Sequence, residues 1–413
     1  MRLENASDGV PGISQEPVGP GGTFLYRVHF KDAGLYWYHP HVREDVQQDM
    51  GLYGNLLIDS PRPDYYSPVN SEEVLMLDDL LFDGDSLVPY GKESSPFTIM
   101  GRFGNVMLVN GETQFHKQAN AGDVIRFFLT NVSNTRTFNL SFGGAPIKLV
   151  ASDVSKFEHE VLVPSVLIAP AERYIIEVKF DKPGEYMMVN KIQALDHMMG
   201  EFYHAADTLG MVMVDPKPTA QDQSAAFKTL RSDPEVKADI DRYRAQFDRP
   251  PDKDLLLTVD VRDLPIIVMQ FISIDTTYRS PVEFTDTMAD INWISTGKEV
   301  RWILKDMTTS KENMDIDWHV KQGEVVKVRI RNDAKSFHPM NHPIHFHGQR
   351  FLVLATNGVK NDNLVWKDTV LLPVGTTADL LVEASNPGKW MLHCHIAEHL
   401  EAGMMALMTV DAN

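Results

Sequence analysis

The 413-residue sequence contains a single cysteine, Cys394, so no disulfide bond can form within the chain. It is also poor in cations: 39 Lys and Arg stand against 57 Asp and Glu, and the net charge is −18. A surface this acidic repels nucleic acid and anionic lipid, which excludes nucleic acids as partners. No uninterrupted apolar run is long enough to cross a bilayer, so membrane insertion is not expected. The first residues lack the charged and then apolar layout of a signal peptide.

Three similar blocks of sequence follow one another along the chain. Each has a proline-led turn and an alternating strand, then a Gly turn and an aromatic-bearing strand, then a short apolar strand that ends in an acidic residue. The blocks begin at Pro20, Pro170 and Pro373. Short strands between Gly and Pro turns are typical of Greek-key β-sandwiches. The sequence therefore predicts an all-β fold of three Greek-key β-sandwich domains in series.

The repeats also predict the domain boundaries. The second and third blocks are preceded by a further strand, at 122–131 and 323–332, whereas only 19 residues precede Pro20. The first domain is therefore expected to be incomplete. The predicted division is a first domain at 1–62, a second at 63–216, a linker at 217–253 and a third domain at 254–413.

The linker contains the one clear helical pattern. Ser232 and Glu235 have the spacing of a capping box, in which each side chain bonds the other residue's backbone. Four apolar residues then recur at helical spacing, at Val236, Ile240, Tyr243 and Phe247. We expect a surface helix over Ser232 to Phe247 with no role in function.

Three short motifs hold the candidate metal ligands. HPH supplies His39 and His41, HPIHFHG supplies His342, His345 and His347, and HCHIAEHLEAGM supplies His393, Cys394, His395, His399 and Met404. Because side chains alternate between the two faces of a strand, His393 and His395 point one way and Cys394 the other. A single strand can then serve two metal sites. Pro343 is expected to offset His342, which would let it join Cys394.

One thiolate, two imidazoles and a weakly bound thioether form the ligand set of a blue copper site. His342, Cys394, His399 and Met404 supply that set, and the remaining histidine pairs are predicted to converge on a polynuclear copper centre. A lone His-x-His is more often a surface or core feature, and a lone cysteine is more often inert. Zinc prefers a closed site of four N and S ligands, which these motifs do not offer. Three motifs in matching repeat positions favour copper.

At these residues the chain resembles the three-domain, laccase-like multicopper oxidases over nearly its whole length, and the HCH-x3-H-x4-M spacing is highly specific. The resemblance implies cupredoxin-like domains, with type 1 copper on His342, Cys394, His399 and Met404. It implies type 2 copper on His345 and a pair of type 3 copper ions on His39, His41, His347, His393 and His395, where dioxygen is reduced to water.

The sequence departs from that family in two places. The family's first His-x-His-Gly motif is absent before 2–12, as expected if the numbering starts at an internal methionine, so the oxygen site has six of its eight histidines here. Many relatives carry a Glu, credited with proton delivery, where this chain has Leu400. Asp8 matches another family carboxylate near the oxygen cluster and is the predicted proton donor.

The leading hypothesis is an oxidase that takes single electrons from a phenol, an aromatic amine or a low-valent metal ion and passes them to O2. The alternatives are a blue-copper electron-transfer or copper-binding protein, or a structural β-protein, which the full blue-site ligand set disfavours. A weaker hint of Cu(I) oxidation comes from the methionines around His197, which are Met187, Met188, Met198 and Met199. Relatives are commonly exported, which predicts a periplasmic or secreted protein. An uncovered sheet edge in the first domain leaves a homo-oligomer open.

Overall fold

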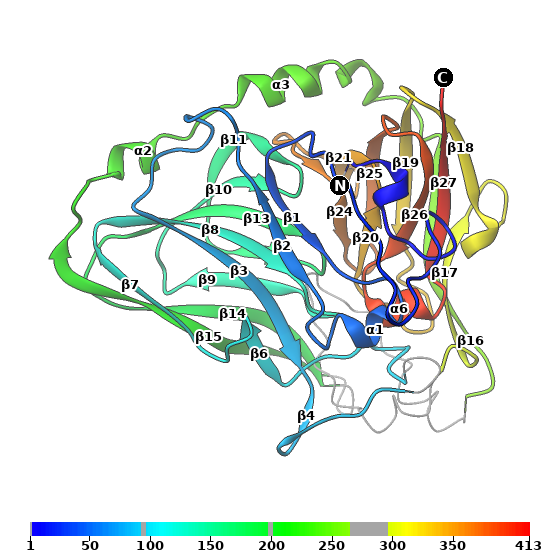
Figure 1. Ribbon diagram of the computed structural model, residues 1–413, viewed down its shortest axis with the longest axis horizontal. Helices are drawn as coiled ribbons and strands as arrows, with labels where there is room; N and C mark the ends of the chain where they lie inside the picture. Colours follow the sequence, from blue (N-terminus) through cyan, green and yellow to red (C-terminus); the bar gives the residue numbers. More distant parts are fainter. Residues whose placement is uncertain (1, 92–95, 197–200, 265–295) are drawn as a thin grey trace.

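The computed structural model describes residues 2–91, 96–196, 201–264 and 296–413. Strands dominate these residues, and the helices are short, so the all-β prediction is confirmed. In Figure 1 the sheets formed by residues 71–218 and those formed by residues 253–411 lie on either side of the first two strands of the chain, within residues 34–58. Within the described residues, no helix combines the length and apolar character needed to span a bilayer.

The first 62 residues form little regular structure apart from one antiparallel pair. Strand β1 (Gly34–Tyr38) pairs with β2 (Gly54–Ile58), and the short helices η1 (Asn5–Ser7) and α1 (Glu44–Gln47) flank them. Many of the exposed large apolar side chains lie in this region: Val18, Phe24, Leu25, Tyr26, Val28, Tyr38, Val42, Met50, Leu52 and Leu57. The first 62 residues therefore carry more of the exposed large apolar side chains than the sheets that follow them.

The next group of strands comprises β3 (Ser71–Leu80), β4 (Phe82–Asp83), β5 (Ser86–Leu87), β6 (Val106–Val109), β7 (Phe115–Ala121), β8 (Asp123–Asn131), β9 (Phe138–Phe142), β10 (Ile147–Ser152), β11 (Ser155–Val163), β12 (Val166–Ile168), β13 (Arg173–Phe180), β14 (Gly184–Asp196) and β15 (Glu201–Pro218). They form a six-stranded sheet, β11-β10-β13-β8-β3-β6, and a five-stranded sheet, β12-β9-β14-β15-β7, beside the small pair β4-β5. One core takes side chains from both large sheets, and Phe127 meets Phe142 across it with ring centroids 4.9 Å apart. This is sandwich packing.

The last group comprises β16 (Lys253–Val261), β17 (Val300–Asp306), β18 (Asp317–Lys321), β19 (Val325–Asn332), β20 (His342–Phe346), β21 (Arg350–Thr356), β22 (Val359–Lys360), β23 (Trp366–Lys367), β24 (Thr369–Leu372), β25 (Thr377–Glu383), β26 (Gly388–Cys394) and β27 (Met405–Asp411), with η3 (Asn313–Asp315) and α6 (Ala397–Glu401). A seven-stranded sheet, β17-β16-β19-β25-β21-β22 with β23 on β21, packs on a five-stranded sheet, β18-β27-β26-β20-β24. Apolar residues alternate along these strands, so Leu255, Leu257 and Val259 of β16 all point into the core.

Between the two groups, the chain forms α2 (Ser224–Lys228), α3 (Pro234–Asp241) and η2 (Arg244–Gln246). The predicted helix is therefore present but shorter, and the predicted cap is wrong. Asp233 caps α3 by accepting the N–H groups of Glu235 and Val236, because the Pro at the first helical position moves the start past Ser232. Ser232 instead lies 2.8 Å from His159.

Among the described strands, each sheet draws on one of the predicted domains, apart from small overhangs at Lys253 and Pro218. We propose to keep the predicted boundaries on that basis. The apolar stripe of the linker region packs against Trp366 and Leu352 of the last group of strands, and this contact fixes the linker on that group.

A buried ion pair ties the three parts together. The guanidinium of Arg173 on β13 binds both carboxylate oxygens of Asp368, at 2.6 and 2.8 Å, in the segment just before β24. Its Nε also donates to the carbonyl oxygen of Leu35 on β1, at 3.2 Å. Both charged side chains are almost fully buried. One arginine thus connects β13 with β1 and with the segment between β23 and β24.

Replacing Arg173 by Met should lower the free energy of unfolding by about 3–5 kcal/mol, because Asp368 loses its bidentate partner in a buried site. Arg329→Met is the matched control, since Arg329 pairs with Asp379 in a partly exposed position, where such a pair contributes about 1 kcal/mol or less. Denaturant unfolding of both variants measures the difference. Equal losses in the free energy of unfolding would contradict a larger contribution from the buried pair.

Candidate metal centre

Two neighbouring strands place most of the predicted ligands. β20 and β26 pair antiparallel, with Ile344 opposite Cys394 and His345 opposite His393. β20 continues regularly through Pro343, with His342 opposite Leu372 on β24. His342 and His345 are three positions apart, so alternation alone puts them on opposite faces. The predicted offset at Pro343 is therefore wrong, although its outcome, His342 beside Cys394, is what the structure shows.

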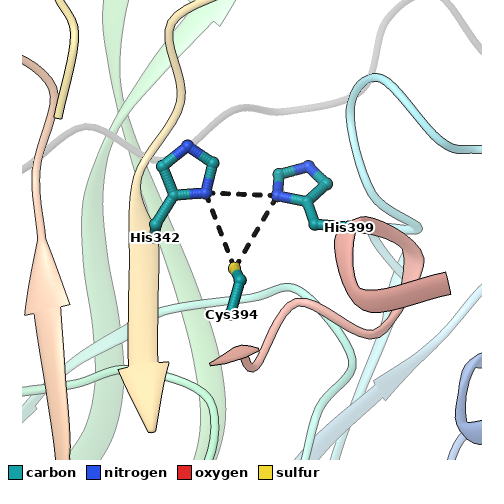
Figure 2. A group of neighbouring side chains, drawn as sticks. All are labelled: His342, Cys394 and His399. Atoms are coloured by element: carbon teal, nitrogen blue, oxygen red, sulfur yellow. Dashed lines mark hydrogen bonds between the residues drawn. The ribbon is translucent and has the colours of Figure 1, made fainter. Parts of the chain in front are cut away.

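One face of this strand pair holds the sulfur site. The Cys394 Sγ lies 3.5 Å from Nδ1 of His342 and 3.8 Å from Nδ1 of His399, and these two nitrogens are 3.3 Å apart. Figure 2 shows the three side chains, from β20, the end of β26 and α6, pointing toward one another. One sulfur and two nitrogens in a triangle are the donor set of a trigonal blue copper site.

Burial controls the protonation of the sulfur site. All three side chains are essentially inaccessible to solvent, and the Trp302 ring packs on His399 with centroids 4.0 Å apart. Burial lowers the pKa of His342 to about 3 and that of His399 well below its usual value. Burial also raises the pKa of the Cys394 thiol. The imidazoles are therefore neutral with free lone pairs, and a metal must displace the thiol proton.

Met404 is the predicted axial ligand. Its side chain is fully buried, and it follows His399 by five residues in the chain. Its N–H donates to the carbonyl of His399 at 2.9 Å, and its own carbonyl accepts from the N–H of Cys394 at 3.1 Å. These bonds fix the loop from α6 to β27 against both predicted ligands.

The other six histidines among the predicted ligands lie together on the opposite face. Ring centroids of neighbouring imidazoles are 4.7 Å apart for His39 and His41, 4.8 Å for His345 and His347, and 5.3 Å for His393 and His395. The pairs also meet one another, for example His39 with His395 at 4.9 Å. We call these six residues the imidazole cluster.

Hydrogen bonds on Nδ1 fix the tautomers of three cluster histidines. Nδ1 of His345 donates to the carbonyl of Asp368 at 2.8 Å, and Nδ1 of His393 donates to the carbonyl of Cys394 at 2.8 Å. Nδ1 of His347 lies 3.1 Å from both carboxylate oxygens of Asp8. A neutral imidazole with its proton on Nδ1 presents a bare lone pair on Nε2.

The cluster fits a metal because its ring nitrogens face one another. Nε2 of His347 and Nε2 of His393 are 3.1 Å apart. Burial, followed by the neighbouring imidazoles, lowers the pKa of His393 well below its usual value, so the Nε2 lone pair of His393 is unprotonated. Nδ1 of His39 and of His395 have no hydrogen-bond partner among the described residues. A cation between such nitrogens would be bound by their lone pairs, and imidazole suits copper.

The carboxyl groups of Asp8, Glu44 and Asp368 lie beside cluster histidines, and of these only Asp8 was predicted. Burial raises the pKa of Asp8, but the charge and hydrogen bond of His347 and the charge of His41 outweigh it, and the net pKa is lowered. Burial raises the pKa of Glu398 to about 8, with Thr135 donating to it at 3.0 Å. Glu44 lies within 3.4 Å of two cluster histidines. Its position three residues after His41 was the available signal.

A cavity of about 590 Å³ opens onto this cluster. Asp8 and Arg173 line it together with five of the six cluster histidines, which are His39, His41, His345, His347 and His395. The sulfur site is on the other face of the strand pair and does not line this cavity. Small molecules therefore have a route to the imidazole cluster.

Comparison with known families agrees with this geometry. Three family models, each described as multicopper oxidase, match residues 1–63, 63–208 and 283–413. Laccase-1 of Botryotinia fuckeliana is 26% identical over 100% of this chain and 71% of its own length.

Solved structures show the same fold. A multi-copper oxidase from Pseudomonas thermotolerans has a TM-score of 0.68 at 24% identity, over 99% of this chain and 84% of that one. A multicopper oxidase from Campylobacter jejuni, described as a metallo-oxidase, also has a TM-score of 0.68, at 22% identity over 94% of this chain and 74% of that one.

The chain belongs to the multicopper oxidase family. It is a laccase-like oxidoreductase that uses O2 as acceptor and copper as cofactor, as its sequence predicted. The assignment of individual residues to individual copper ions remains a prediction.

The pKa of His41 is lowered to about 3, chiefly by burial and by the charge of His347. Between its usual value of 6.5 and this value, the unfolded metal-free chain binds a proton at His41 that the folded chain does not. Unfolding therefore takes up a proton, and acid destabilises the fold. His41→Gln should flatten the fall in stability between pH 6.5 and 3 by up to about 1.4 kcal/mol per pH unit. Denaturant titrations at several pH values test this, and parallel curves for both proteins would contradict it.

Proposed function

We propose that the chain is a laccase-like oxidase with one electron-accepting copper at the sulfur site and a copper cluster at the imidazoles. In this proposal His342, Cys394, His399 and Met404 hold type 1 copper. His345 holds type 2 copper, and His39, His41, His347, His393 and His395 hold the type 3 pair.

The observation that carries this proposal is the arrangement of the two donor sets on opposite faces of one strand. His393 and His395 are the covalent neighbours of Cys394, and the Cys394 carbonyl accepts from Nδ1 of His393 at 2.8 Å. Bound copper would accept single electrons at the sulfur site and supply the reduction of O2 to water at the cluster. The backbone of Cys394 is thus a direct covalent connection between the two.

The residues of the chain orient the metal ligands and exclude water from the sulfur site. Trp302 covers the imidazoles of His342 and His399, which keeps water from the sulfur site. Backbone carbonyls and Asp8 hold protons on Nδ1 of His345, His393 and His347, which leaves Nε2 free to bind metal. Arg173 holds Asp368, whose carbonyl orients His345. Ligand geometry is thus set before metal arrives.

Reduction of O2 to water also consumes protons, and we propose that buried carboxyl groups supply them. The sequence favours Asp8, which lines the cavity and contacts His347. Its lowered pKa makes it a carboxylate at neutral pH, so it would have to take up each proton from water in the cavity. Glu398, with a pKa of about 8, holds a proton at neutral pH and is a second candidate.

We propose a phenol or an aromatic amine as the reducing substrate, following the laccase relatives. The alternative of metal-ion oxidation depends on methionines around His197 that would bind Cu(I). It has less support among the described residues, because Met188 is fully buried in the core of the sheets formed by residues 71–218. His197, Met198 and Met199 lie outside the described residues. We also propose a periplasmic or secreted location, by analogy with the same relatives. The exposed apolar surface near β1 and β2 supports a homo-oligomer.

Replacing Cys394 by Ser should abolish the intense visible colour of the copper-loaded protein, because that colour needs a copper–thiolate bond. Substrate-driven O2 consumption should fall with it, while copper remains at the imidazole cluster. Absorption spectra, metal analysis and an oxygen electrode measure the three. A blue Cys394→Ser protein would contradict the proposed sulfur site. Loss of colour with full O2 consumption would show that electrons enter elsewhere.

Replacing Met404 by Leu should keep the colour and raise the reduction potential of the blue copper, because a weak axial ligand stabilises Cu(II) over Cu(I). Met405→Leu is the matched control, since Met405 follows directly and packs in the small cluster with Val10 and Met391. Redox titration of both variants decides between the two residues. A shift only in the Met405 variant would move the axial role to Met405.

A further inference from the structure

Glu44 is a buried carboxylate inside the imidazole cluster. It is 1% exposed, and Oε1 lies 3.3 Å from Nδ1 of His39 and 3.8 Å from Nε2 of His395. Oε2 lies 3.4 Å from Nδ1 of His41. Neither oxygen has a hydrogen-bond partner among the described residues, and neither has Nδ1 of His39. A carboxylate in this position costs stability unless something pairs with it.

The distances suit a shared cation better than hydrogen bonds. One donor atom from each of His39, His41 and Glu44 lies within 4.8 Å of the other two. Two ligands that each lie about 2 Å from one ion are separated by less than about 4 Å, as the oxygens of Glu44 are from Nδ1 of His39 and of His41. The N–H direction of His39 misses the carboxylate, because its Nδ1 has no acceptor. These donors therefore surround a common point between them.

The fold aims Glu44 at this point. The HPH motif directly follows β1, the chain turns at Arg43 with φ of 50°, and Glu44 opens α1. Trp37 stacks on the His39 ring at 4.2 Å and 15°, which holds the ring edge toward Glu44. The next acid on the helix, Asp45, is paired with Arg43 at 2.8 Å. Glu44 is thus the acid of α1 that reaches the cluster histidines.

We propose that the Glu44 carboxylate is a direct copper ligand of the cluster, alongside His39 and His41. This inference rests on the proposed function of the cluster. A carboxylate is a harder donor than imidazole and carries a negative charge, so it would strengthen the binding of Cu(II) more than that of Cu(I). It would also give the cluster an oxygen ligand that the histidine motifs do not contain.

The test compares Glu44→Gln and Glu44→Ala with Asp45→Asn, which removes the same charge from the same helix outside the cluster. Copper per chain is measured against increasing chelator, and the blue band serves as an internal reference for the sulfur site. Both Glu44 variants should release cluster copper at chelator concentrations at least about tenfold lower than the wild type. Their blue bands should be unchanged, and Asp45→Asn should retain its copper.

Gln keeps the shape of Glu and accepts hydrogen bonds, so it separates a ligand from a residue that only orients the histidines. Wild-type copper retention in Glu44→Gln would overturn the proposal, whatever Glu44→Ala shows. Thermal unfolding of the metal-free proteins tests for a folding defect, since Glu44→Gln keeps the shape of Glu and adds no charge to the buried site, and should melt no lower than the wild type. A wild-type protein that binds copper at the sulfur site alone would instead contradict the proposed copper cluster on which this inference rests.

Discussion

The alternation of side chains along β26 is the constraint on which the rest of the centre depends. Consecutive residues of an extended strand point to opposite faces, so Cys394 and its neighbour His393 must serve different sites. The pairing of Ile344 with Cys394 and of His345 with His393 fixes which face each β20 residue joins. A slip of one residue would exchange the faces and mix sulfur with the wrong imidazoles. The cores of both sheets oppose that slip.

Burial is the second constraint, and it has a cost. It keeps the imidazoles of the sulfur site neutral and the thiol protonated, and it leaves Nδ1 of His39 and of His395 without a hydrogen-bond partner among the described residues. The folded chain tolerates this because ion pairs such as Arg173 with Asp368 and large cores hold the surrounding strands. Metal binding recovers part of the cost, which couples copper affinity to the stability of the fold.

The sequence predicted the parts that depend on short spacing. Repeated strand patterns gave the all-β class, and the three motifs contain each histidine of the cluster and of the sulfur site. The sequence did not predict partners that meet through tertiary packing. Trp302, Asp368 and Arg173 belong to no motif and reach the site from other strands. Two local details were predicted wrongly: Asp233 caps α3 in place of Ser232, and strand alternation, not an offset at Pro343, places His342.

The central claim is that one strand carries two metal sites on its opposite faces. Anomalous diffraction at the copper edge, from crystals of the copper-loaded protein, tests it most directly. We expect one peak within the triangle of His342, Cys394 and His399, and separate peaks among the six imidazoles across the strand. A single peak at the triangle would contradict the oxidase and leave an electron-transfer protein. Peaks at the imidazoles without one at Cys394 would contradict the sulfur site.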